Sequence, residues 1–164
     1  FNVPYAAVHG GKEAAGLIPA EQGIEVRFSI DPEIWPTEAD EGQIQQVLRH
    51  IIQNAVEAMP GGGAMDILAG NAIVEASDRL PIREGRYVKI SIRDHGQGIP
   101  EEHLSKIFDP YFTTKEARRG LGRAVSYAII RNHEGLIRVE SRKGQFSAFQ
   151  ILLPAAREAV TRVQ

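Results

Sequence analysis

The chain carries ADEGQIQQVLRHIIQNAVEAMPGGG at residues 39–63, and this segment predicts the main core helix of the domain. Asp40 followed by Gln43 predicts a capping box that starts a helix, and Pro60 with the glycines after it ends that helix. Apolar residues recur at helical spacing and define one buried face: Ile44, Val47, Leu48, Ile51, Ile52, Ala55, Ala58 and Met59. The polar edge of the same helix carries Gln46, His50, Asn54 and Glu57.

Strand patterns surround this helix. Alternation of apolar and polar residues predicts strands over 24–30, 64–75 (one or two strands, interrupted by Gly70), 87–94, 136–141 and 147–153. Two further helices are expected, at 100–107 and from Gly122 to about His133. This order lacks the regular βαβαβ alternation of a Rossmann fold. We therefore expect an α+β fold, a two-layer α/β sandwich with a mixed, mostly antiparallel sheet and about three helices on one face.

The composition is that of an ordinary globular domain. Of 164 residues, 43% are hydrophobic and 24% charged, which excludes a disordered chain. The 19 Lys and Arg against 21 Asp and Glu lack the basic excess typical of nucleic-acid binders. There is no cysteine and no apolar run of membrane-spanning length. We expect no nucleic acid and no membrane contact, and, because the chain starts at Phe1, a fragment of a longer protein.

Asp94 shares a strand face with Val88, Ile90 and Ile92, so its carboxylate is predicted to point into the core. A buried carboxylate requires a hydrogen-bond donor. The glycines of Asp94-His95-Gly96-Gln97-Gly98-Ile99 allow close approach of the backbone to a ligand, which suggests a ligand amine bound by Asp94. The alternative is an aspartate that caps its own turn.

Asn54 offers an amide oxygen on the helix edge, and Mg²⁺ prefers oxygen ligands while keeping several waters. His50 faces the same way one turn earlier. The alternative is a solvated polar stripe without a ligand.

Gly120-Leu121-Gly122 is predicted to precede a helix, and the free N–H groups of a helix start suit phosphate. Lys115, Arg118 and Arg119 add positive charge nearby, although a basic loop is often only solvated. Together, an amide for a metal, a buried acid for an amine and a helix start for phosphate are the parts of an Mg-ATP site.

Four motifs resemble those of sensor histidine kinases, in the same order and spacing. Residues 39–63 resemble the N box, DHGQGIP at 94–100 the G1 box, KIFDPYFTTK at 106–115 the F box and GLG at 120–122 the core of the G2 box. Residues 141–154 resemble the closing strands, so the resemblance covers roughly residues 23–154. The short spacing between Lys115 and Gly120 is similar to the short-lid subgroup of nitrogen-regulation and oxygen-sensing kinases. This resemblance implies the Bergerat ATP-binding fold of the GHKL superfamily.

The resemblance also implies roles for individual residues, with ATP and Mg²⁺ as cofactors. Asn54 is implied as the Mg²⁺ ligand, Asp94 as the partner of the adenine amino group, and His50 as a residue of the catalytic site. The other implied nucleotide-binding residues lie in the G1 box, the lid and the closing strands: Gly96, Gly98, Ile99, Phe108, Phe112, Lys115, Gly120, Leu121, Gly122 and Ser147.

The implied activity is transfer of the ATP γ-phosphoryl group to a histidine on a separate dimerisation domain. This domain is then expected to be cytoplasmic. The full-length kinase, cytoplasmic or membrane-anchored, is expected to be a homodimer that acts on a response regulator. Residues 1–22 would lead in from the dimerisation domain, 23–154 would form the catalytic domain and 155–164 a tail. None of the five histidines lies in a His-Glu/Asp-x-x-x-Pro setting, so we expect this fragment to lack the phosphoacceptor.

The G2 box departs from the family's usual Gly-x-Gly-Leu-Gly-Leu. Arg118 replaces the first glycine and Arg123 the last leucine, while Phe146-Ser147 stands where Gly-Thr is usual. The two cations either impair the lid or help to hold the triphosphate. The rival function is therefore a non-catalytic GHKL regulatory module with weakened ATP binding, and a third is an anti-sigma-factor serine kinase.

Overall fold

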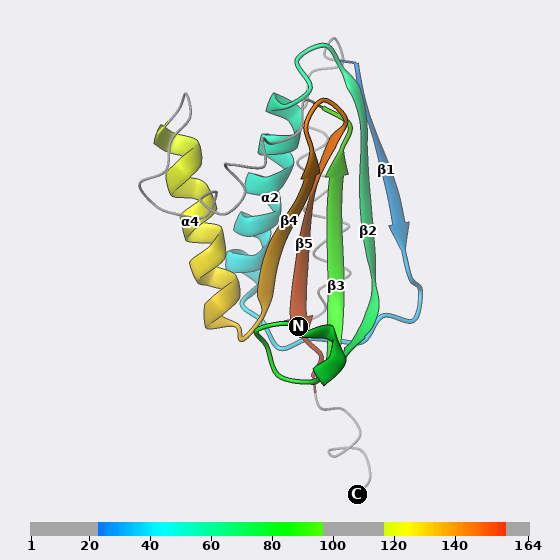
Figure 1. The fold of residues 1–164 in the computed structure, drawn as a ribbon, viewed down its shortest axis with the longest axis vertical. Coiled ribbons are helices and arrows are strands. Elements are labelled where there is room, and N and C mark those ends of the chain that lie inside the picture. The colour runs from blue at the N-terminus through cyan, green and yellow to red at the C-terminus, as the bar shows by residue number, and fades with distance from the viewer. Residues whose placement is uncertain (1–22, 97–116, 157–164) are drawn as a thin grey trace, which may run out of the picture.

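A computed structural model describes residues 23–96 and 117–156, with side chains in the second range from Ala124 onward. The predicted short helix at 100–107, the F box, the lead-in and most of the tail lie outside these residues. The described part contains a five-stranded sheet of order β1-β2-β3-β5-β4 (Figure 1). Its strands are β1 (Ile24–Ile30), β2 (Gly63–Val74), β3 (Gly85–Asp94), β4 (Leu136–Arg142) and β5 (Phe146–Pro154). Only β1 and β2 pair in parallel within this sheet, and the other neighbours are antiparallel.

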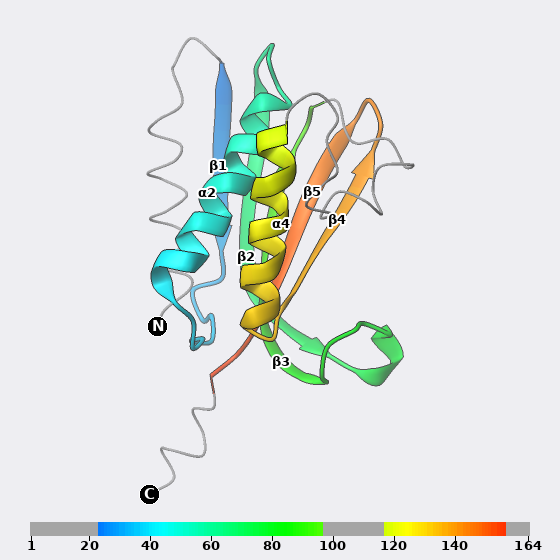
Figure 2. The same cartoon turned by 90° about the vertical axis from the view of Figure 1, so that its left-hand side faces the viewer.

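Two α-helices of the described residues cover one face of the sheet, α2 (Glu41–Glu57) and α4 (Ala117–Asn132) (Figure 2). The expected α+β sandwich with a mixed, mostly antiparallel sheet is therefore confirmed, with two of the three expected helices described. Neither helix combines the length and apolar character needed to cross a bilayer.

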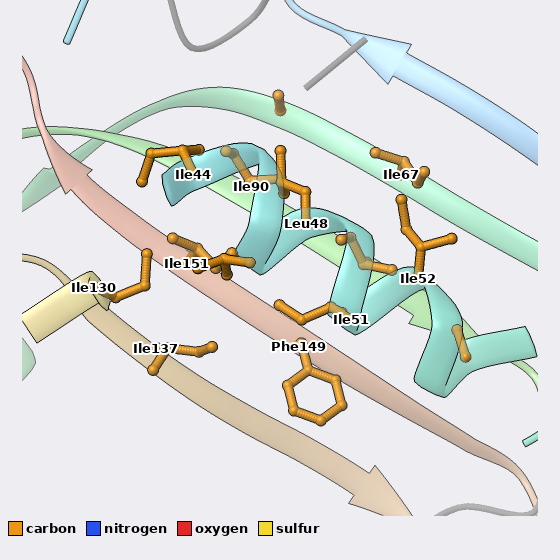
Figure 3. Packing of buried hydrophobic residues seen from close by; sticks show 14 of the residues in the cluster. Ile44, Leu48, Ile51, Ile52, Ile67, Ile90, Ile130, Ile137, Phe149 and Ile151 are labelled. Carbon is orange, nitrogen blue, oxygen red and sulfur yellow. The ribbon is translucent and has the colours of Figure 1, made fainter. Parts of the chain in front are cut away.

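The core lies between the helices and the sheet. Figure 3 shows Leu48 and Ile51 of α2 above the apolar side chains of the central strands, with Ile130 of α4 beside Ile137 of β4. Alternation puts every second strand residue on this face. Each such fully buried side chain contributes roughly 1.5–3 kcal/mol by leaving water, so the apolar stripe of α2 fixes the helix against the strands that carry the site.

The start of α2 differs from the expected capping box. The Asp40 side chain accepts a hydrogen bond from the Gln43 backbone N–H (2.9 Å), as predicted. The reciprocal partner of the Asp40 backbone N–H is the imidazole Nε2 of His133, at 3.1 Å. His133 Nδ1 lies 2.8 Å from the Ile129 carbonyl oxygen and donates to it. This histidine therefore ties the end of α4 to the start of α2.

Two boundaries also differ from the expectations. The strand β2 runs unbroken through Gly70, because its pairing with β3 continues past that residue. The helix α4 begins at Ala117 and not after Gly122. Alanine and arginine are strong helix formers, so Ala117, Arg118 and Arg119 extend the helix where the family's glycine would weaken it.

Candidate nucleotide-binding site

Asp94 is the last residue of β3 and points to the helix-covered face, where it is only 2% exposed. The Ser147 hydroxyl, directly opposite on β5, donates to Asp94 Oδ2 at 2.6 Å. The Gly96 backbone N–H donates to Oδ1 at 3.0 Å. Burial raises the pKa of Asp94, although the Ser147 hydroxyl, the Gly96 N–H and His95 partly offset that rise. Since a carboxylate has about four lone-pair positions, these two bonds leave capacity to accept from a ligand amine.

Asp94 does cap its own turn through Gly96, so the alternative interpretation of this motif describes a real contact. A turn cap alone, however, does not require burial beside a donating serine. The Ser147 hydroxyl is therefore a partner of the aspartate. Phe146 points to the opposite face, where the Arg93 guanidinium lies 3.9 Å from the centre of its ring.

Gly96 packs against the end of α2. A Cβ on this residue would lie 2.3 Å from the Ala58 carbonyl oxygen, which is closer than any real contact. Only glycine therefore allows the turn after β3 to approach the helix end this closely. The Ala58 N–H in turn bonds to the Asn54 carbonyl oxygen at 3.0 Å. The Asp94 turn and Asn54 consequently lie at the same end of α2.

Asn54 is half-buried, and its amide Nδ2 lies 3.2 Å from Nε2 of the half-buried His50. A neutral imidazole accepts from this amide when its proton is on Nδ1. That bond directs Nδ2 toward His50 and leaves Oδ1 on the other side of the amide. An oriented amide oxygen is a suitable Mg²⁺ ligand, so the residues present fit the metal that the sequence implies.

The predicted phosphate site changes in detail because α4 starts early. The N–H groups of the first three residues of a helix have no intrahelical partner, and here they belong to residues 117–119. Gly120, Leu121 and Gly122 therefore lie further inside the helix, where backbone N–H groups bond to carbonyl groups four residues earlier. Gly98, Ile99, Phe108, Phe112 and Lys115 lie outside the described residues.

Two cavities help to locate the site. A pocket of about 220 Å³ lies between α2 and α4 and is lined by His50, Gln46 and Ser126 among others. A larger cavity of about 660 Å³ lies at the opposite end of β3, near Gly85 and Tyr87, and contains none of the predicted site residues. Because the smaller pocket is lined by the predicted site residue His50, it is the better candidate to adjoin the nucleotide.

Sequence reasoning missed a contact on the other face of the sheet. His95 Nε2 lies 3.1 Å from Asp66 Oδ2, and Arg27 Nε lies 2.8 Å from Asp66 Oδ1. The polar alternation of β2 and β1 puts Asp66 and Arg27 on the open face, but it does not reveal which residues of neighbouring strands lie together.

Comparison with known proteins places the chain. Residues 39–157 match the family described as "Histidine kinase-, DNA gyrase B-, and HSP90-like ATPase". Sporulation kinase A of Bacillus subtilis (strain 168) is 38% identical over 133 residues, which are 80% of this chain and 20% of that protein. The chain thus spans about a fifth of the length of this relative.

Solved structures agree with this assignment. The catalytic domain of histidine kinase ThkA has a TM-score of 0.76 and 30% identity, covering 94% of this chain and 93% of that one. ThkA in complex with the response regulator protein TrrA has a TM-score of 0.72 and 29% identity, covering 95% of this chain and 41% of that one. The chain therefore belongs to the histidine kinase-, DNA gyrase B- and HSP90-like ATPase family, as an ATP-binding catalytic domain of the sensor histidine kinase type.

Proposed function

We propose that this chain binds Mg-ATP and transfers the γ-phosphoryl group to a histidine on a separate helical dimerisation domain. The observation that carries the proposal is the buried Asp94 carboxylate, which Ser147 and Gly96 hold at the end of β3. Its remaining lone pairs suit the exocyclic amine of adenine. Asn54, at the same end of α2, then faces the phosphate side of the nucleotide.

The residues of α2 and α4 divide the remaining work. Asn54 holds Mg²⁺ through Oδ1, and His50 fixes the amide in that orientation by accepting from Nδ2. When bound there, Mg²⁺ would supply charge neutralisation for the phosphates. The N–H groups that open α4 at Ala117 provide further positive potential for the phosphates. Phosphoryl transfer depends mainly on positioning and charge neutralisation, and these groups supply both.

The partners follow from this activity. We propose that the whole kinase is a cytoplasmic or membrane-anchored homodimer whose dimerisation domain carries the phosphoacceptor histidine. A response regulator then receives the phosphoryl group from that histidine. The ThkA–TrrA complex supports this assignment, because it joins a structurally similar kinase to a response regulator protein.

The direct test is phosphoryl transfer in trans. The chain is mixed with γ-labelled ATP, Mg²⁺ and a helical hairpin that bears the acceptor histidine, and acid-labile label on the hairpin is measured. We expect transfer by the parent chain and its loss in Asp94→Asn and Asn54→Ala. The control is Asp78→Asn, a carboxylate near the opposite end of β3 that accepts from the Glu75 N–H. The proposal is overturned if neither the parent chain nor the control transfers label to the hairpin.

The substitutions in the G2 box provide the test of the degenerate alternative. If Arg118 and Arg123 have weakened ATP binding, the double change Arg118→Gly with Arg123→Leu should increase affinity for ATP but not for adenosine. If they hold the triphosphate, the same change should weaken ATP binding, and the loss should shrink at high salt because exposed charges are screened. An acid-stable phosphoserine on an added anti-anti-sigma substrate would instead favour a serine kinase.

A further inference from the structure

On the open face of the sheet, the carboxylate of Asp66 on β2 binds residues from two other segments, Arg27 of β1 and His95 after β3. Asp66 of β2 accepts from Arg27 of β1, with Nε 2.8 Å from Oδ1, and pairs with His95, with Nε2 3.1 Å from Oδ2. His95 is the residue between Asp94 and Gly96. We propose that Asp66 is a positioning residue for nucleotide binding, which acts by holding His95 and thereby the turn that aims Asp94. This inference rests on the proposed function, because it names a residue that supports the adenine contact.

Strand alternation explains how one turn is held from both faces. Successive residues point to opposite sides of a sheet, so Asp94 faces the helices while His95 faces the open side. Asp66 lies beside Arg93 in the β2–β3 register, one position before Asp94. Gly96 then returns to the helix side and packs on Ala58. The turn is therefore fixed on the helix side by glycine packing and on the open side by the Asp66–His95 bond.

The negative charge of Asp66 makes it a stable hydrogen-bond acceptor for His95. Burial raises the pKa of Asp66, but the hydrogen bonds from His95 and Arg27 outweigh that effect and lower the pKa overall. Asp66 therefore stays ionised at neutral pH and can accept from the Nε2–H of His95. Arg93, its direct neighbour on β3, does not compete for the carboxylate, because its guanidinium lies over the Phe146 ring.

The connection to the nucleotide is the Gly96 N–H. This group donates to Asp94 Oδ1 and helps to orient the carboxylate that should accept from adenine. Without the tie on His95, the turn has more conformations available and the Gly96 bond opens more often. The nucleotide must then order the turn again, which reduces affinity. A partly exposed ion pair is worth little, so we expect a loss of about two- to fivefold.

A double-mutant cycle tests the pair. Adenosine and ATP affinities are measured by calorimetry for the parent, Asp66→Ala, His95→Ala and the double variant. We expect each single change to weaken both ligands by a similar factor and the double change to add little more. His95→Gln should recover most of the affinity, because its amide still donates to Asp66. The matched control is Arg27→Ala, which removes the other partner of Asp66 and leaves His95 in place.

A second readout does not need the nucleotide. Exchange of the Gly96 amide hydrogen, followed by NMR in the free protein, should be faster in Asp66→Ala and His95→Ala than in Arg27→Ala. The inference is overturned if Asp66→Ala changes neither Gly96 exchange nor ligand affinity. It is also overturned if the affinity losses of the two single variants multiply in the double variant. If the parent chain binds no ATP but Gly96 exchange is still faster in Asp66→Ala, the Asp66–His95 contact holds the turn as inferred. That result overturns the proposed function instead.

Discussion

The change Asp94→Asn separates the contribution of this residue to binding from its contribution to stability. In the free protein, Oδ1 accepts from the Gly96 N–H and Oδ2 from the Ser147 hydroxyl. An asparagine can keep its oxygen toward Gly96 and turn its NH₂ toward Ser147, whose hydroxyl then accepts instead of donating. The substitution therefore keeps a hydrogen bond to both Gly96 and Ser147 in the free protein.

The conflict arises when the nucleotide binds. The adenine amine is a donor, and in the variant it meets the NH₂ of the introduced amide in place of a carboxylate oxygen. Flipping the amide only moves the conflict to the Gly96 N–H. One hydrogen bond is lost and one buried donor has no acceptor, which costs about 1–3 kcal/mol. Affinity should therefore fall by about 5- to 150-fold.

Stability should not fall with it. Burial raises the pKa of Asp94 in the folded protein, so folding favours its protonated form. That stabilisation is fully present below the unfolded pKa and is lost as pH rises through the folded pKa. At neutral pH the ionised carboxylate costs stability, and Asp94→Asn removes this cost. We expect an unchanged or higher Tm at pH 7 and no such gain in acid.

Calorimetric titration with adenosine, ADP and ATP, combined with thermal unfolding, checks both halves. The loss of affinity should be the same for all three ligands, since they share adenine, and Asp78→Asn should bind like the parent. An Asp94→Asn variant that binds adenosine as tightly as the parent refutes the assigned contact. Weakened binding together with a large drop in Tm at pH 7 would mean that the change disrupts the fold and that the reasoning about burial is wrong.

Three further outcomes follow from other contacts of the structure. Gly96→Ala should lower the free energy of unfolding by about 1–3 kcal/mol in urea titrations, because its Cβ would lie 2.3 Å from the Ala58 carbonyl oxygen; wild-type stability would contradict the close packing. His133→Ala should cost about 1–2 kcal/mol by the same measurement, since it removes the acceptor of the Asp40 N–H, and an unchanged midpoint would show that water replaces the imidazole. Adenosine affinity should fall on acidification at a higher pH than the pKa of an ordinary aspartate, because burial raises the pKa of Asp94; a profile that persists in Asp94→Asn would assign the titration to another group.

Much of the fold could be predicted because its signals are local. The apolar stripe of α2 has a period that only a helix satisfies, and the alternation of β3 puts Asp94 on the buried face. The predicted start of α4 was wrong because Gly120-Leu121-Gly122 indicated a helix start, whereas the helix propensity of Ala117, Arg118 and Arg119 moves the start upstream. Local propensity decided that boundary.

The contacts that sequence could not supply are those between strands and between helices. The partner of the Asp40 N–H is 93 residues away in His133, and Asp66 is 29 residues from His95. Neither pair follows from periodicity, since each depends on strand register or helix packing. The hydroxyl of Ser147 was predicted from a motif, but its bond to Asp94 required the β3–β5 register.

In the proposed site, Asn54 holds Mg²⁺ and Asp94 holds the adenine of ATP. The most direct measurement is the ATP affinity of the parent chain and of Asn54→Ala, each with Mg²⁺ and with a chelator. We expect Mg²⁺ to tighten ATP binding to the parent, Asn54→Ala to abolish most of this gain, and both proteins to bind adenosine equally. Equal losses with and without Mg²⁺, or a parent chain that binds no ATP, would contradict this assignment.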